Sequence, residues 1–274
     1  MAVGRTHIYS GLRTTTGKII FMTAPNKSLG QHWLTDRDVL GSIADWAEIK
    51  PEDTVLEIGP GLGTLTSELL RRAKKVIAVE FDPELARKLP GQFPGKNLEV
   101  VHQDILSYDL SQLPAGYKVV ANVPYYITSK IVQMLMTSTN KPSTTVLLVQ
   151  KEVAERIAAR SGDMSILAIS AQVYAEAYLG DVVPAALFTP PPKVDSQIVI
   201  LQTLPNPHIA PEEEKAFFRV VKAGFSAKRK KLRSSLSGGL GISKQEVEEM
   251  LTKADISPDA RAEDLSISDW KKLV

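Results

Sequence analysis

Short apolar runs alternate along the chain with segments in which apolar residues recur every three or four positions. The short runs predict buried β-strands, and the periodic segments predict helices that bury one face. The predicted strands span residues 54–58, 76–80, 98–101, 117–121, 144–149, 179–183 and 196–201. Strands that alternate with helices indicate an α/β fold, in which a mostly parallel, seven-stranded sheet carries helices on both faces.

The helices expected between these strands begin at residues that favour helix starts. Asp36 can cap a helix that runs to about Ala47, and Asp82 with Pro83 opens another. The remaining helices are expected from about residue 64 for about ten residues, at 128–136, from about 151, and at 166–174. No helical segment separates the last two strands, so we expect them to pair antiparallel at one edge of the sheet.

The strand pattern ends at residues 204–207, where two prolines mark a boundary. Helical periodicity then returns at residues 212–236, 244–253 and 267–273. We therefore expect an α/β domain at residues 26–204 and a small all-α domain at residues 205–274.

Residues 1–25 precede the first predicted element and contain Ser, Thr and basic residues but no acid. This composition is typical of an organelle transit peptide. It also fits a disordered extension, a cloning remnant or an over-long gene start, because Met22 can serve as a second start. We favour these simpler explanations and expect residues 1–25 to be a disordered extension.

The overall composition, 43% apolar and 23% charged, is that of an ordinary soluble protein. The chain has no Cys, and its four His include no His-x-x-x-His pair, so we expect neither disulfides nor a metal site. No apolar run reaches the ~18 residues of a membrane span. We expect a cytoplasmic monomer that binds no membrane. The net charge of +2 is too small to indicate nucleic-acid binding by itself.

A glycine-rich turn follows the strand at 54–58 and places Gly59, Gly61 and Gly63 before a helix. A dinucleotide-binding turn is one interpretation, but its third glycine would fall at Thr64. The spacing Glu-x-Gly-x-Gly-x-Gly instead favours S-adenosyl-L-methionine (SAM), because glycines let the backbone approach an adenosine and a methionine moiety.

Two acids end neighbouring strands at the same predicted edge. Glu80 ends the second strand, and a carboxylate there can accept hydrogen bonds from both ribose hydroxyls of a nucleoside. Asp104 follows the third strand and is placed to accept from the amine of the cofactor adenine. Either acid alone can be a helix cap or a surface residue. Together with the glycine turn, at the edge where open α/β sheets bind ligands, they favour SAM over NAD.

The stretch Asn122-Val123-Pro124-Tyr125 follows the fourth strand. The Asn122 side-chain oxygen and the Val123 carbonyl can accept from an aromatic amine and direct its lone pair at a methyl group. Pro124 fixes the backbone, and Tyr125 offers a face on which an extruded base can stack. Catalysis would then rest mainly on positioning. The simpler interpretation is a strand-to-helix turn without chemistry.

Four stretches together resemble one family: Ser28–Gln31, Glu57–Gly63, Asn122–Tyr125 and Phe188–Ser196. They are similar to the ribosomal RNA small subunit adenine N6,N6-dimethyltransferases of the KsgA (RsmA) type, from about Asn26 to the C-terminus. The resemblance implies a Rossmann-like class I SAM-dependent methyltransferase. It also implies transfer of methyl groups to the N6 amines of two adjacent adenines in a 3′-terminal hairpin loop of small-subunit (16S) rRNA. The implied partner is the immature 30S subunit.

The resemblance also implies roles for individual residues. It places SAM contacts at His32, Leu34, Gly59, Glu80, Asp104 and Asn122. The segment 31–34, which the residues alone would assign to packing, then becomes a cover over the cofactor. Phe188 is expected to flank the target base opposite Tyr125. The family usually has Asn-Phe where this chain has His32-Trp33; a His still offers one donor or acceptor, so SAM binding is expected to persist.

Residues 215–244 carry nine Lys or Arg and no acid. A charge run of this kind is often only a solvated face. We favour contact with the RNA backbone, because acids on both sides confine the positive charge to one region. The candidate RNA-binding residues are Lys222, Lys228, Arg229, Lys230, Lys231 and Arg233.

Three alternative functions stay open. A large-subunit (23S) rRNA adenine dimethyltransferase of the macrolide-resistance type shares the same core, and the basic helical tail is the reason to prefer the small subunit. A DNA adenine methyltransferase is disfavoured because no separate base-reading domain is visible. A non-catalytic ribosome-assembly or transcription factor on the same fold is disfavoured because Glu80 and residues 122–125 are intact.

Overall fold

The computed structural model describes residues 31–227 and 229–274. The N-terminal extension 1–25, residues 28–30 of the first motif and Lys228 lie outside the described residues. Within the described ranges, no helix is both long and apolar enough to cross a membrane.

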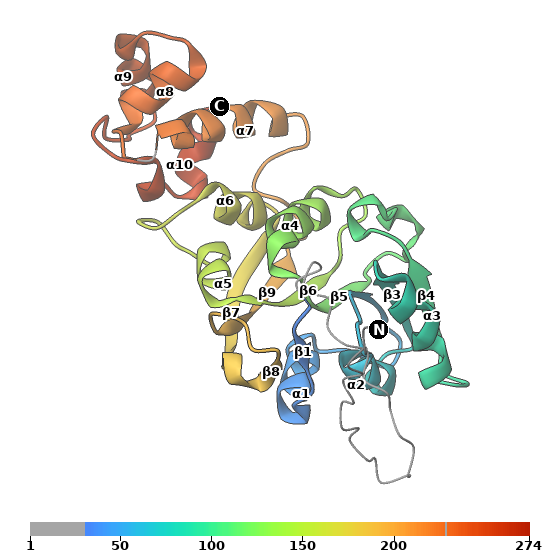
Figure 1. Ribbon diagram of the computed structural model, residues 1–274. Coiled ribbons are helices and arrows are strands. Elements are labelled where there is room, and N and C mark those ends of the chain that lie inside the picture. Colours follow the sequence, from blue (N-terminus) through green and yellow to red (C-terminus); the bar gives the residue numbers. More distant parts are fainter. Residues whose placement is uncertain (1–30, 228) are drawn as a thin grey trace, which may run out of the picture.

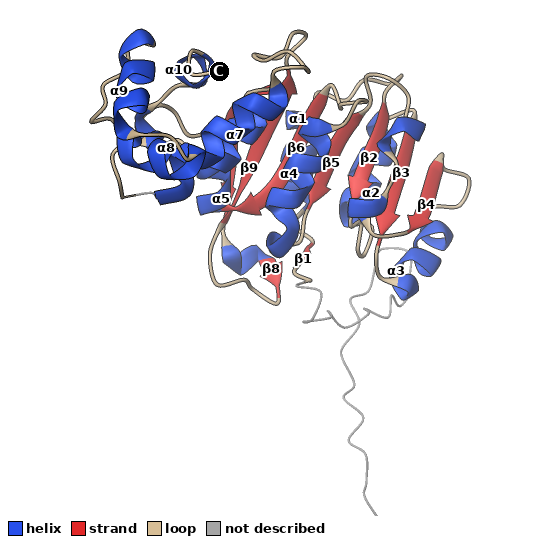
Figure 2. Ribbon diagram, turned by 90° about the horizontal axis from the view of Figure 1, so that it is seen from above, coloured by secondary structure: helices blue, strands red, loops and turns tan. Residues whose placement is uncertain are grey.

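A seven-stranded sheet runs through the described α/β part, in the order β4-β3-β2-β5-β6-β9-β7 (Figure 2). Its strands are β2 Thr54–Ile58, β3 Lys75–Glu80, β4 Leu98–His102, β5 Lys118–Asn122, β6 Thr144–Gln150, β7 Ala175–Val183 and β9 Ser196–Thr203. The pairs from β4 through β6 are parallel, whereas β9 is antiparallel to both β6 and β7. The mostly parallel sheet with an antiparallel pair at one edge is confirmed.

Helices cover both faces of this sheet (Figures 1 and 2). They are α1 Arg37–Trp46, α2 Thr64–Arg72, α3 Pro83–Lys88, α4 Thr128–Thr137, α5 Lys151–Ile157 and α6 Ile166–Gln172. Side chains alternate along a strand, so β2 sends Val55 into the core beside α1 and α2, and Leu56 and Ile58 into the core beside α4. Because both faces of the sheet are covered, the strands are continuous apolar runs, which is the pattern that identified them in the sequence.

Several element boundaries differ from the prediction, and three of them bear on the arrangement of the sheet and the site. β7 begins at Ala175, four residues before the predicted strand, since Ala175 pairs with Thr203 of β9. The same pairing ends α6 at Gln172. β5 is shifted by one residue, which makes Asn122 the last residue of the strand.

The C-terminal helices are α7 Glu214–Gly224, α8 Leu232–Leu240, α9 Lys244–Lys253 and α10 Ile267–Lys271. The predicted single helix over 212–236 is wrong: a 3₁₀ turn at Phe225–Ala227 follows α7, and α8 starts separately. A Cβ on Gly224 would overlap the Trp270 ring, and one on Gly239 would lie 2.5 Å from the Ala223 Cα. The break lets α8 fold back and cross α7 at these small residues.

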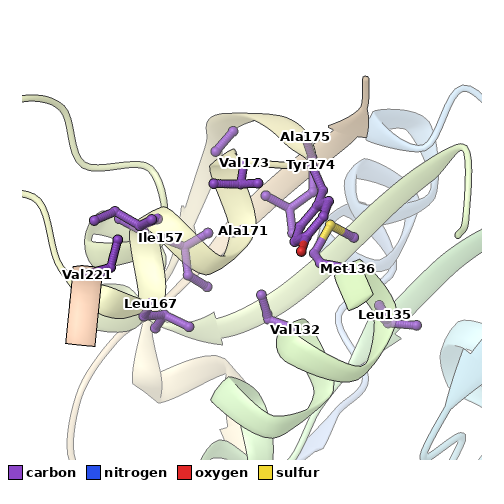
Figure 3. Packing of buried hydrophobic residues seen from close by; sticks show 14 of the residues in the cluster. Val132, Leu135, Met136, Ile157, Leu167, Ala171, Val173, Tyr174, Ala175 and Val221 are labelled. Carbon is purple, nitrogen blue, oxygen red and sulfur yellow. The ribbon is translucent and has the colours of Figure 1, made fainter. Parts of the chain in front are cut away.

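The helical C-terminal part is joined to the α/β part by a continuous apolar core. One cluster extends from the β-sheet through Leu167 of α6 to Phe217 of α7 and Trp270 of α10. Figure 3 shows Val221 of α7 beside Leu167, with Val132 of α4 to the right of Leu167. The backbone N–H groups of Gly162 and Met164 also donate to the Glu263 carbonyl, at 2.9 and 3.1 Å.

A second, two-stranded sheet was not predicted. β1 Trp33–Leu34 pairs antiparallel with β8 Phe188–Thr189. This short ribbon brings Trp33 and Leu34 against the start of the Phe-Thr-Pro-Pro-Pro stretch. Each strand has two residues, which is too short for an alternation pattern to register.

Candidate active site

A cavity of about 320 Å³ opens at the carboxyl ends of β2, β3 and β5. Open α/β sheets bind ligands at this edge, and a cavity of this size is typical of small-molecule sites. Ten of the residues singled out from the sequence line it: His32, Leu34, Gly59, Gly61, Glu80, Asp104, Asn122, Val123, Pro124 and Tyr125. Gly63 and Phe188 are not among its lining residues.

Gly61 forms the floor of the cavity and is held in a conformation that only glycine adopts readily. Its φ is +57°, and its N–H donates to Glu80 Oε2 at 3.0 Å. A Cβ at Gly61 would lie 2.7 Å from Cζ3 of Trp33, whose buried ring covers the turn. Gly59 also has a positive φ, of +66°. Both glycines line the cavity in a left-handed conformation that other residues rarely adopt.

Gly63 lies behind the cavity wall. It precedes α2 as its N-cap with a φ of +80°, and a Cβ there would lie 2.7 Å from Cδ1 of Leu89. The predicted cofactor contact of Gly63 is therefore not brought into the cavity by the structure. Its glycine identity is explained by the turn and by close packing.

Glu80 is almost fully buried, at 5% exposure, and both of its oxygens already accept hydrogen bonds. Oε2 accepts from Gly61 N–H, and Oε1 accepts from Asp82 N–H at 2.8 Å. Burial raises the pKa of this carboxyl, and the backbone N–H bonds oppose the rise. Since a carboxylate oxygen has two lone pairs, each oxygen keeps one acceptor site for a ribose hydroxyl.

Asp104 is exposed on the rim of the cavity. Its Oδ1 accepts from Leu106 N–H at 3.0 Å and caps the 3₁₀ turn Ile105–Ser107. This geometry realises the helix-cap interpretation and leaves Oδ2 without a hydrogen bond to the described part of the chain. The cap orients the carboxylate, and the second oxygen is available to an amine donor.

Glu57 lines the cavity and was quoted in the sequence only as the start of the glycine motif. Its side chain is 1% exposed, and Thr66 Oγ1 donates to its Oε2 at 2.6 Å. Burial raises the pKa of Glu57 to about 8, against the Thr66 hydrogen bond and with a contribution from the nearby Glu80 charge. With this pKa, Glu57 carries a proton near neutral pH. The sequence signal for a buried acid of this kind is a single Glu inside an otherwise apolar strand.

The strand end at Asn122 places polar groups on the cavity wall. Asn122 is half-buried, and its amide side chain makes no hydrogen bond to another described residue. The buried Val123 is anchored through its N–H, which donates to the Leu148 carbonyl at 3.4 Å. Pro124 follows with a φ of −59°. This rigid turn holds the Asn122 amide in place without using its polar atoms.

Tyr125 is held at both ends. Its hydroxyl is hydrogen bonded to Ser196 Oγ at 2.7 Å, and its ring stacks on the His32 imidazole with centroids 5.9 Å apart and planes 19° apart. The His32 Nδ1 is in turn 2.7 Å from the Pro190 carbonyl. Burial raises the pKa of the Tyr125 hydroxyl, so it stays a neutral hydrogen-bonding group.

Phe188 does not face Tyr125 across the cavity. It is 2% exposed and belongs to the core cluster that includes Leu34 and Leu40. The structure therefore brings His32, rather than Phe188, against the Tyr125 ring. The physical reason is the β1–β8 ribbon, which turns Phe188 inward as a neighbour of Leu34.

The cavity residues suit SAM. Gly59 leaves room that a Cβ would fill, whereas at Gly61 the Trp33 ring packs into that space. Glu80 and Asp104 offer acceptors for ribose hydroxyls and an exocyclic amine, while Glu57 adds a buried acid below them.

A model of the family described as ribosomal RNA adenine dimethylase matches residues 22–274. The chain belongs to the ribosomal RNA adenine dimethylase family. The ribosomal RNA small subunit methyltransferase A of Dehalococcoides mccartyi (strain CBDB1) is 45% identical over 251 residues, which are 90% of this chain and 86% of that protein. The protein of the same name from Moorella thermoacetica is 41% identical over 263 residues, 91% of each chain.

Two solved structures support the assignment of this dimethylase. The crystal structure of the 23S rRNA methyltransferase ErmE has a TM-score of 0.73 and 31% identity, covering 88% of this chain and 97% of that one. A dimethyladenosine transferase from Plasmodium falciparum has a TM-score of 0.76 and 30% identity, covering 88% and 96%. The fold is that of a class I SAM-dependent methyltransferase, and the enzyme is a SAM-dependent rRNA adenine dimethyltransferase.

Most of the described cations of the basic run fall into three groups: two in ion pairs, two exposed between helices, and three in a groove. Lys231 pairs with Asp259 at 2.9 Å, and Arg233 pairs with Glu248 at 3.0 Å. Arg229 and Lys230 are exposed between α7 and α8.

Lys222 instead lies in a groove of about 1010 Å³ between α7 and the helices α4 and α6. Lys215 and Arg219 line the same groove at helical spacing. Among the described residues, none of these three cations forms an ion pair. This basic groove therefore holds three cations without an ion-pair partner in the described chain, together with one acid, Glu214.

Proposed function

We propose that this dimethylase transfers methyl groups from SAM to the N6 amines of two adjacent adenines in the 3′-terminal hairpin loop of small-subunit rRNA. The substrate is the immature 30S subunit in the cytoplasm. Two observations support the choice of substrate: relatives at 41–45% identity are named small subunit methyltransferase A, and the basic helical tail is present. The observation that carries the chemistry is the uncommitted Asn122 amide in the same cavity as Glu80 and Asp104.

Bound SAM supplies an electrophilic methyl group, and the chain supplies position. Glu80 and Asp104 hold the nucleoside end of the cofactor through their free acceptor sites. The Asn122 side-chain oxygen and the Val123 carbonyl accept from the two N–H bonds of the target amine. These hydrogen bonds turn the nitrogen lone pair toward the cofactor side of the cavity. Alignment of this kind can contribute on the order of 7–11 kcal/mol.

Tyr125 is the residue on which we propose the target base stacks. Its hydroxyl is anchored on Ser196, so the ring offers a fixed platform. His32 already lies against this ring, and the adenine either displaces it or uses the other face. A contact between Phe188 and the base would require Phe188 to leave the core, so we assign it to supporting the ribbon beneath the site.

The basic groove provides the sequence-independent part of binding. Lys215, Arg219 and Lys222 present uncompensated charge along one face of α7. Such residues bind phosphates with a strong dependence on salt and without reading bases. Arg229 and Lys230 extend this surface toward α8.

The test is methyl transfer from radiolabelled SAM to small subunits that lack this modification, beside large subunits and DNA. We expect transfer to small subunits alone, mapped to the two adjacent adenines. Absence of transfer to small subunits by the wild type, or full transfer by Asn122→Ala, would refute the proposal.

The second candidate is dimethylation of large-subunit rRNA, which the similarity to the ErmE structure favours. The same assay separates the two functions, because transfer to large subunits alone would establish this alternative.

A further inference from the structure

Two consecutive tyrosines on the cavity wall have opposite environments. Tyr125 is partly buried, hydrogen bonded and stacked, as described above. Tyr126 also lines the cavity but is 64% exposed. It belongs to neither of the two apolar core clusters. The burial that accounts for most aromatic residues of the fold therefore does not account for Tyr126.

Lys130 stands beside Tyr126 on the same rim. It lies four residues further on, in the first turn of α4, and lines the same cavity, while Tyr126 belongs to the 3₁₀ turn Tyr125–Ile127 directly before that helix. Lys130 is exposed and forms no ion pair with another described residue. The first turn of α4 contains no acidic side chain. An unshielded cation and an open aromatic ring thus lie together at the mouth of the active site.

Proteins that bind single-stranded nucleic acid use this combination of side chains. Bases stack on exposed aromatic rings whatever their sequence, and a neighbouring cation takes the phosphate. Loop nucleotides of RNA can be splayed out for such contacts. Since Tyr126 directly follows Tyr125, a base on Tyr126 lies within one nucleotide step of a base on Tyr125.

We propose that Tyr126 and Lys130 bind the nucleotide next to the target adenine, with its base stacked on the Tyr126 ring and its phosphate on the Lys130 ammonium. This inference rests on the proposed function, in which two adjacent adenines are modified. The site then holds one adenine of the pair while the other is positioned at Asn122.

A second exposed ring on the rim has a different place. Phe81 is 57% exposed and lines the cavity, but it directly follows Glu80 at the end of β3. It therefore belongs to the cofactor side. Tyr126 and Lys130 come from the segment that carries Asn122 and Tyr125, which is the side of the target base.

The experiment measures binding of a synthetic RNA hairpin with the two adjacent loop adenines by fluorescence anisotropy, in the presence of S-adenosylhomocysteine. Tyr126→Ala should raise the Kd about 10-fold, while Tyr126→Phe and Tyr126→Trp stay within about 2-fold of wild type. Lys130→Gln should lower the slope of log Kd against log salt by about 0.7. Tyr178→Ala, which removes a 40% exposed ring on β7, is the matched control and should change neither value.

Hairpins with an abasic site on either side of the target adenine identify the contacted base. At one of the two positions, the abasic site should weaken wild-type binding as much as Tyr126→Ala does, and it should not weaken Tyr126→Ala further. The affinity for SAM, measured by calorimetry, should be the same in wild type and Tyr126→Ala.

Three results would overturn the inference. They are equal hairpin affinity of wild type and Tyr126→Ala, equal losses in both proteins at every abasic position, and an effect seen only with assembled subunits. The last result would assign Tyr126 to a protein contact. Wild-type methyl transfer to small subunits is measured in parallel, and its absence would refute the proposed function rather than this site.

Discussion

The cofactor cavity and the basic groove hold their charged groups in opposite ways. In the cavity, Glu57 and Glu80 are nearly inaccessible to water, and each is fixed by short hydrogen bonds from its own neighbours. In the groove, Lys215 and Arg219 have no ion-pair partner in the described chain.

This contrast separates two tasks. Fixed, desolvated groups select a ligand by geometry, because a misplaced acceptor inside the fold is expensive. Mobile surface cations attract any phosphate backbone, and salt screens them. Changes in the cavity should therefore alter catalysis and cofactor affinity, whereas changes in the groove should alter the salt dependence of RNA binding.

The largest effect is expected at Asn122, whose side-chain oxygen is one of the two proposed acceptors for the target amine. Asn122→Ala should lower single-turnover methyl transfer on the order of 10²-fold, because the amine loses its alignment. The Kd for RNA should change little, since the groove cations are intact. Rapid-quench assays with saturating enzyme give the rate. A transfer rate within a factor of about two of wild type would show that Asn122 does not position the substrate.

Gly61→Ala should give the next largest effect. The new methyl group would meet the Trp33 ring and would also strain a left-handed backbone. We expect the Kd for SAM to rise by about 10-fold or more and the free energy of unfolding to fall by about 1–3 kcal/mol.

Gly95→Ala is the control for Gly61→Ala, because Gly95 also has a positive φ, of +72°, but open space around it. It should lower stability through backbone strain alone and leave SAM affinity unchanged. Calorimetry and urea unfolding separate the two quantities. Equal SAM affinities of the two variants would show that the close packing of Gly61 against Trp33 does not matter for SAM binding.

The raised pKa of Glu57 should make the free energy of unfolding depend on pH. Its pKa is about 8 in the folded protein, against 4.5 for an unperturbed Glu side chain. A raised pKa of a carboxyl contributes stability that is fully present below about pH 4.5 and is lost as the pH rises toward 8. The unfolding free energy of wild type minus that of Glu57→Gln should therefore fall between about pH 5 and 8 and level off above. Urea titrations at several pH values test this, and a difference independent of pH would contradict it.

The groove should give the smallest of these effects, a loss of RNA affinity that is largest at low salt and shrinks as the salt concentration rises. Replacing Lys215, Arg219 and Lys222 together with Gln should lower the salt slope of RNA binding by about 2, since each phosphate contact on a single strand contributes ~0.7. SAM affinity should stay the same.

The matched control for the groove variant is Lys231→Gln with Arg233→Gln, because these cations already pair with Asp259 and Glu248. The control should lower the salt slope of RNA binding by less per removed charge than the groove variant does. If it lowers the slope as much per charge as the groove variant, the ion pairs do not distinguish the two groups.

Much of the cavity was predictable because its residues follow local patterns. Glu80, Asp104 and Asn122 each end or follow a strand of a parallel sheet, and such ends meet at one edge. The glycine turn can be recognised from its own sequence alone. The packing role of Gly63 could not, because it depends on contact with Leu89, which is distant in the chain.

The features that the sequence did not reveal depend on distant partners. The inward position of Phe188 follows from pairing with β1, and the break after α7 follows from Trp270. The neutralisation of Lys231 depends on Asp259, which lies outside the run of basic residues. A count of charges along the sequence contains no information on these pairings.

The β1–β8 ribbon has a consequence for the order of assembly during synthesis. The contact between His32 and Pro190 joins positions 158 residues apart, so this side of the cavity depends on a contact of very high sequence separation. Such contacts form late, because a long loop must close first. A nascent chain that has emerged only as far as β6 already contains Glu80 and Asn122, yet its cofactor site still lacks a wall. We therefore expect a nascent chain to gain cofactor affinity only after β8 has been synthesised, and not when the glycine turn forms.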